Sequence, residues 1–122
     1  MPQESVDGEF LYYRKHDKAD DTYRSVWRMP VGGGQETKVL DSIHTVGGYR
    51  VREKGIYFFS PPDEQGHSDI CLYEFDTGKK RKIQTIEGRI GYYIEVSPDG
   101  QTILYTQYDQ AGSDLMLVEN FR

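Results

Sequence analysis

The stretch SPDGQTILY, residues 97–105, decides the fold class because it joins a turn signature to a strand signature. Ser97-Pro98-Asp99-Gly100 combines the residues that favour a tight turn, with proline second and glycine fourth. Branched and aromatic side chains follow at once in Thr102 to Tyr105, and such side chains pack well on a pleated surface. The stretch therefore predicts a turn that leads directly into a β-strand.

The same pattern recurs along the chain at a spacing of about 45 residues. Ser5-Val6-Asp7-Gly8 lies two periods before Ser97 and also precedes an aromatic strand, EFLYYR. Gly55 precedes IYFFS one period before Gly100, although the rest of its turn motif is lost. A period of 40–50 residues with four short strands per repeat is typical of β-propeller blades.

The remaining composition agrees with sheet rather than helix. The 122 residues include only two alanines but 16 aromatic side chains, and short apolar runs separated by turn residues predict ten strands. With blade strands named A (innermost) to D (outermost), we predict an all-β partial propeller of about 2.5 four-stranded antiparallel blades. Residues 1–122 form one domain, in which 5–43 supply strands B–D, 44–88 supply A–D and 89–122 supply A–C, a 3+4+3 division.

These motifs resemble the WD-repeat-like repeats of TolB-type bacterial β-propellers. The resemblance rests on Ser97-Pro98-Asp99-Gly100, on Ile103-Leu104-Tyr105 and on Ser113-Asp114-Leu115, and it extends over roughly residues 5 to 121. It implies a sensory or scaffolding segment of a larger bacterial protein, and a periplasmic location is suggested by the resemblance alone.

A row of fewer than three blades is shorter than the four to eight of known propellers. Its two end sheets would expose apolar faces, which monomers rarely leave bare. We therefore expect either self-association into a homo-oligomer or continuation into further blades of a longer parent chain.

The loops between strands B and C are acidic and fall on one rim of a propeller. As partner-binding rim residues we nominate Asp17, Asp20, Asp21, Asp63, His67, Asp69, Asp109 and Asp114. Carboxylate clusters also suit hard cations, yet Asp and Gly commonly shape turns by accepting local backbone hydrogen bonds. The sequence leaves both alternatives open and places no metal site.

No catalytic motif is present: the sequence lacks GxSxG, a phosphate-binding loop, GxGxxG and HExxH. We expect a non-catalytic binding or interaction module without a cofactor, with a protein or small ligand on the rim. The alternatives are a self-assembling structural fragment without a ligand and an accessory propeller of a hydrolase encoded elsewhere.

The net charge of −5 disfavours nucleic-acid binding. The sequence contains neither a signal peptide nor an apolar run long enough for membrane insertion, so we expect a soluble chain.

Overall fold

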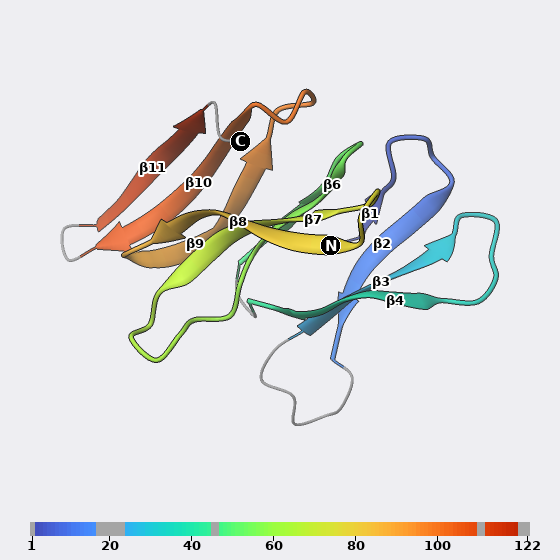
Figure 1. The fold of residues 1–122 in the computed structure, drawn as a ribbon, viewed down its shortest axis with the longest axis horizontal. Helices are drawn as coiled ribbons and strands as arrows, with labels where there is room; N and C mark the ends of the chain where they lie inside the picture. The colour runs from blue at the N-terminus through green and yellow to red at the C-terminus, as the bar shows by residue number, and fades with distance from the viewer. Residues whose placement is uncertain (1, 17–23, 45–46, 110–111, 120–122) are drawn as a thin grey trace.

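The computed structural model describes residues 2–16, 24–44, 47–109 and 112–119, and within these ranges it contains eleven β-strands and no α-helix. The strands form three antiparallel sheets that stand side by side like the blades of a fan (Figure 1). This arrangement confirms the predicted all-β partial propeller. No helix capable of crossing a membrane occurs in the part of the chain that is described.

Each sheet is a meander in which consecutive strands pair with one another. The first sheet contains β1 (Gln3–Glu4), β2 (Phe10–Lys15), β3 (Arg24–Pro30) and β4 (Thr37–Ile43). The second contains β5 (Tyr49–Val51), β6 (Gly55–Phe59), β7 (Ser68–Glu74) and β8 (Lys79–Ile86). The third contains β9 (Arg89–Val96), β10 (Thr102–Asp109) and β11 (Gly112–Glu119).

The first sheet has one strand more than the sequence predicts. β1 pairs with β2 through Gln3↔Tyr12 and Glu4↔Leu11, so this sheet also has an innermost strand and the division becomes 4+4+3. Two polar residues carry no strand signal of their own. As blade boundaries, 5–43, 44–88 and 89–122 stay a prediction.

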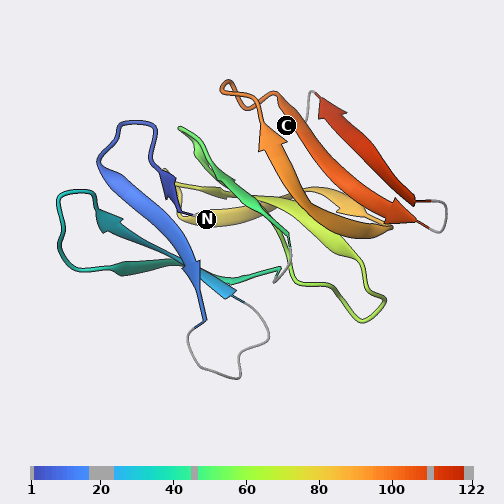
Figure 2. The same cartoon turned by 180° about the vertical axis from the view of Figure 1, so that it is seen from behind.

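The second sheet lies between the other two and is buried on both faces (Figure 2). All five residues of β6 are buried. Ile56 and Phe58 pack with Tyr12 of the first sheet, whereas Tyr57 and Phe59 pack with Tyr105 of the third. Successive strand residues point to opposite faces, so one short apolar strand holds both neighbouring sheets.

The two Ser-x-Asp-Gly turns have the same hydrogen bonds. The Ser97 hydroxyl donates to Asp99 Oδ1 at 2.6 Å and accepts a hydrogen bond from the Thr102 amide at 3.1 Å. In the first sheet, the Ser5 hydroxyl likewise donates to Asp7 Oδ1 at 2.6 Å and accepts from the Phe10 amide at 3.0 Å. The repeat seen in the sequence is therefore a repeat of conformation.

Polar side chains also join the innermost strands of adjacent sheets. The Gln3 amide bridges β1 to β5: its nitrogen donates to the Tyr49 carbonyl, and its oxygen accepts from the Val51 amide at 2.9 Å. Between β5 and β9, the Arg52 guanidinium contacts Glu95 Oε1 at 2.7 Å and the Val96 carbonyl oxygen at 2.9 Å. These links fix the sheets relative to one another near the centre of the fan.

Gly100→Ala is expected to destabilise the protein more than Gly66→Ala. Both glycines have positive φ, 72° and 84°, where an L-residue costs about 1–2 kcal/mol. Only at Gly100 would the added Cβ also lie 2.7 Å from another group, the hydroxyl of buried Tyr57. Urea unfolding of both variants measures the difference, and equal losses would contradict this packing argument.

Acidification is expected to weaken both Ser-x-Asp-Gly turns. Hydrogen bonds from Ser5 and Ser97, and then from the backbone, hold the pKa values of Asp7 and Asp99 below the ordinary 3.8. A carboxyl with a lowered folded-state pKa stabilises above its unfolded pKa and loses that contribution as pH falls through the folded value. The melting temperature of D7N/D99N should therefore fall less between pH 5 and pH 3 than that of the unmodified chain, although the variant starts lower at pH 6.

Candidate functional site

The described loop between the second and third strands of the middle sheet, 60–67, lies on the rim of the molecule opposite the turns at 5–9 and 97–101 (Figure 1). The described part of this rim comprises His16 at the end of β2, the loop 60–67, and the facing ends of β10 and β11. Asp17, Asp20 and Asp21 lie outside the described residues. The partner-binding role of the eight nominated rim residues stays a prediction.

Asp63 organises the loop 60–67. Its Oδ1 accepts hydrogen bonds from the amides of Gln65 and His67, both at 2.9 Å, and its own amide donates to the His67 carbonyl at 2.8 Å. The hydrogen bond from His67 is the main reason that the pKa of Asp63 is lowered. Such bonds are those of a turn-forming aspartate, so they account for the acidic side chain without a ligand.

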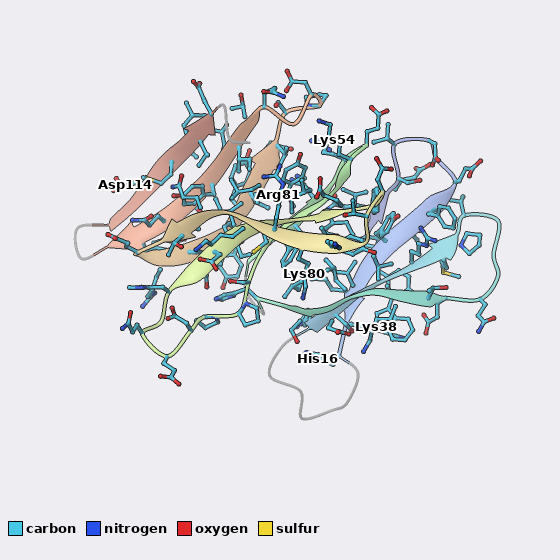
Figure 3. All side chains as sticks on the ribbon, in the orientation of Figure 1. His16, Lys38, Lys54, Lys80, Arg81 and Asp114 are labelled. Carbon is cyan, nitrogen blue, oxygen red and sulfur yellow. The ribbon has the colours of Figure 1, made fainter. Side chains whose placement is uncertain are left out.

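The other described rim residues are spread along the rim. Asp69 is the second residue of β7, where its amide donates to Ser60 Oγ at 2.9 Å and its carbonyl accepts from the Ser60 amide. Asp109 ends β10, and Asp114 is exposed on β11, far from His16 (Figure 3). Among the described residues no group of three or more His, Cys, Asp or Glu could hold a metal ion.

A cleft of about 600 Å³ opens on this rim between the second and third sheets. It lies beside the loop that Asp63 shapes and is lined by His44, Pro62, Gly66, Ser68, Gly88, Arg89, Ile90, Gly91, Tyr92 and Tyr108. Its volume falls within the range of ligand-binding clefts. No local sequence pattern predicts this cleft, because its walls come from four separate segments of the chain.

Two exposed tyrosines dominate the cleft. Tyr92 is 74% exposed and Tyr108 is 37% exposed, and Gly91 lets Tyr108 lie close to β9 because a Cβ there would be 2.9 Å from the ring. The tyrosine ring is apolar and its hydroxyl is polar, so the side chain tolerates water when free and packs against a partner when bound. Tyrosine is enriched at protein interfaces for this reason.

The cleft combines one fixed cation with one neutral ring. Arg89 is exposed at its edge. Burial lowers the pKa of His44, so this imidazole is neutral at pH 7, and its Nδ1 accepts a hydrogen bond from the Gly47 amide at 3.3 Å. Neutral His44 therefore carries its proton on Nε2. The cleft can thus offer a guanidinium and two phenol groups to a ligand.

The exposure of both Tyr92 and Tyr93 departs from the pattern of a regular strand. Adjacent residues of a regular strand alternate between faces, so one of the two rings would pack between sheets. Both are exposed, because the pairing of β9 with β10 shifts between Tyr105 and Gln107 and three residues of β9 oppose one of β10. Such a bulge redirects side chains. The Tyr12–Tyr13 pair does alternate, with Tyr12 buried.

A second cleft, of about 700 Å³, lies at the opposite rim between the first and second sheets. Its walls include Phe10, Tyr73 and Phe75, and the Arg28 guanidinium stacks over the Phe10 ring at 4.3 Å.

Cys71 lies on β7, where burial raises the pKa of its thiol to about 11. The thiol is therefore protonated and unreactive near neutral pH.

Comparison with known proteins identifies the fold. The chain is similar to a protein of Agrobacterium tumefaciens described as TolB, with TM-score 0.72, 20% identity and 95% of this chain covered. It is also similar to TolB of Acinetobacter baumannii, with TM-score 0.70, 18% identity and 94% coverage. A Bacteroides fragilis protein described as a 6-phosphogluconolactonase matches more weakly, with TM-score 0.52 and 14% identity over the whole chain.

The chain spans only 40%, 30% and 38% of the lengths of these three proteins. No protein-family model matches the sequence, and no curated protein matches it. The structural likeness therefore establishes the fold: the chain folds as a segment of a TolB-type β-propeller.

Asp63→Ala is expected to lower the free energy of unfolding by about 1–2 kcal/mol, because two backbone amides of the loop lose their acceptor. Glu64→Ala, which removes a neighbouring exposed carboxylate, is the matched control and should stay within about 0.5 kcal/mol. Urea unfolding at pH 7 measures both variants. If Asp63 instead served a cation, the loss would appear only in the presence of added Ca²⁺.

Proposed function

We propose that this chain is a non-catalytic binding segment of a β-propeller, and that the rim cleft beside loop 60–67 receives a peptide segment of a protein partner. The observation that carries this proposal is the pair of exposed tyrosines, Tyr92 and Tyr108, in a cleft of about 600 Å³. An exposed aromatic pair beside a fixed cation is the kind of anchor that interfaces use.

The polar groups of the cleft favour a peptide. Arg89 can pair with a carboxylate, and the phenol groups of Tyr92 and Tyr108 can form hydrogen bonds with a peptide backbone. The nominated rim residues Asp63, His67, Asp69 and Asp114 would extend this surface as a polar margin. In the larger context, the segment would serve as the sensor or scaffold part of a bacterial propeller protein; a periplasmic location stays an expectation from the resemblance.

A second candidate function, self-assembly, is favoured by a different observation. The outer faces of the first and third sheets carry apolar side chains, including the exposed Leu115 and Leu117.

A third alternative, an accessory propeller for a hydrolase encoded elsewhere, predicts activity only when that enzyme is added. Turnover of esterase or peptidase substrates by the purified chain alone would contradict the non-catalytic proposal.

Selection of a random peptide display library against the purified chain tests the cleft. We expect enriched peptides to lose binding at least about tenfold to a Tyr92→Ser/Tyr108→Ser variant, because the loss of two aromatic anchors costs more than 1.4 kcal/mol. Val31→Ser, at an exposed apolar position outside the cleft, is the control and should bind normally. Enrichment that is equal for all three proteins would place the binding surface elsewhere.

A further inference from the structure

The three sheets pack on one another by a single rule, which is visible in the equivalent strands β2, β6 and β10. We call the face of each sheet that is directed towards the next sheet along the chain its leading face. The opposite face, directed towards the preceding sheet, is its trailing face. The leading face carries Phe10 and Tyr12 in the first sheet and Tyr57 and Phe59 in the second. The trailing face carries Ile56 and Phe58 in the second sheet and Ile103 and Tyr105 in the third.

Within the chain this rule operates twice. The leading face of the first sheet meets the trailing face of the second, and the leading face of the second meets the trailing face of the third. Two faces remain without a neighbouring sheet in the described structure: the trailing face of the first sheet and the leading face of the third (Figure 2).

The leading face of the third sheet is apolar. Leu104 pairs directly with Leu117, and Thr106 pairs with Leu115, so these side chains share one face. Leu115 and Leu117 are 64% and 54% exposed. Glu119, opposite Thr102, places an exposed carboxylate at the end of this face.

The trailing face of the first sheet combines apolar side chains with lysines that form ion pairs with neighbouring carboxylates. Leu11 pairs with Met29, and Tyr13 pairs with Trp27. The ammonium of Lys15 lies 3.9 Å from the centre of the Trp27 ring, and Lys38, opposite Trp27 on β4, lies 5.7 Å from it. Glu36 contacts both Tyr13 and Lys15. This face thus offers an aromatic and aliphatic surface to a second apolar surface, while its two lysines are paired with Glu36 and Asp41 of the same sheet region.

We propose that a second copy of this chain covers both faces, with the leading face of each third sheet packed on the trailing face of the other copy's first sheet. The interface would continue the packing rule already used twice within the chain. A contact between two different faces is heterologous, and it closes into a ring when the rotation allows. Two copies give six sheets, within the four to eight of closed propellers, whereas one copy gives three.

The proposal goes beyond the binding function of the rim, and its test does not involve the rim cleft. Light scattering after size-exclusion chromatography measures the mass of the purified chain. We expect twice 14.1 kDa at protein concentrations of about 0.1 mM. A monomer at this concentration would overturn the proposal and assign the open faces to blades of a longer chain, and larger assemblies would overturn the two-copy ring.

Variants on the two faces test which surfaces meet. On the leading face the variant is L115D/L117D, and on the trailing face the variants are M29D and, separately, K38D. Each should weaken the dimer by about 100-fold, because a carboxylate would be buried in an apolar contact or a lysine would be lost. V6D, at an exposed apolar position in the turn between β1 and β2, is the control and should remain dimeric. Circular dichroism and melting temperature confirm that each variant is folded, and K38D keeps the test informative if M29D unfolds.

Mixing separates this interface from a symmetric one. L115D/L117D keeps an intact trailing face and M29D or K38D keeps an intact leading face, so equimolar mixing should restore one of the two contacts and give a 1:1 complex. A dimer of leading face against leading face would instead leave M29D and K38D dimeric on their own, and that result would overturn the proposed pairing.

Discussion

The burial of β6 on both faces is the constraint on which the rest of the structure depends. Ile56 and Phe58 complete the core shared with the first sheet, and Tyr57 and Phe59 complete the core shared with the third. A single twisted sheet of this size cannot bury both of its faces, so every sheet needs a neighbour on each side. Among the described residues, the middle sheet has two neighbouring sheets and each outer sheet has one. The open faces that carry Trp27 and Leu117 follow directly from this arrangement.

Local hydrogen bonds hold the turn between the first and second strands of a sheet. In the first and third sheets a serine hydroxyl and an aspartate carboxylate hold the turn, and a glycine at positive φ closes it. The second sheet lacks these residues, and its tighter turn pairs Val51 with Ile56. There Arg52, at the position of the serine, reaches across to Glu95 and the Val96 carbonyl of the third sheet. The serine motif is therefore absent at the position where Arg52 makes a contact between the second and third sheets.

Function in this architecture depends on loops and strand ends rather than on a catalytic cluster. The acidic residue whose contacts are best defined, Asp63, is engaged with its own loop. The features that we propose to hold a partner are the tyrosines of β9 and β10 and the arginine that begins β9. They meet only because the third sheet packs on the second, so the rim cleft depends on the same core as the fold.

The sequence by itself determined the all-β class, the period of about 45 residues and the position of nearly every strand, because turn residues and alternating apolar residues act over short distances. It also indicated the rim, since loops between equivalent strands recur on one side of a repeat fold. It missed β1, where Gln3 and Glu4 are strand residues only because β2 and β5 supply their hydrogen-bond partners. It likewise missed the exposed Tyr92 and the rim cleft. A bulge and a packing contact between sheets are properties of residues far apart in the chain, so only the tertiary structure decides them.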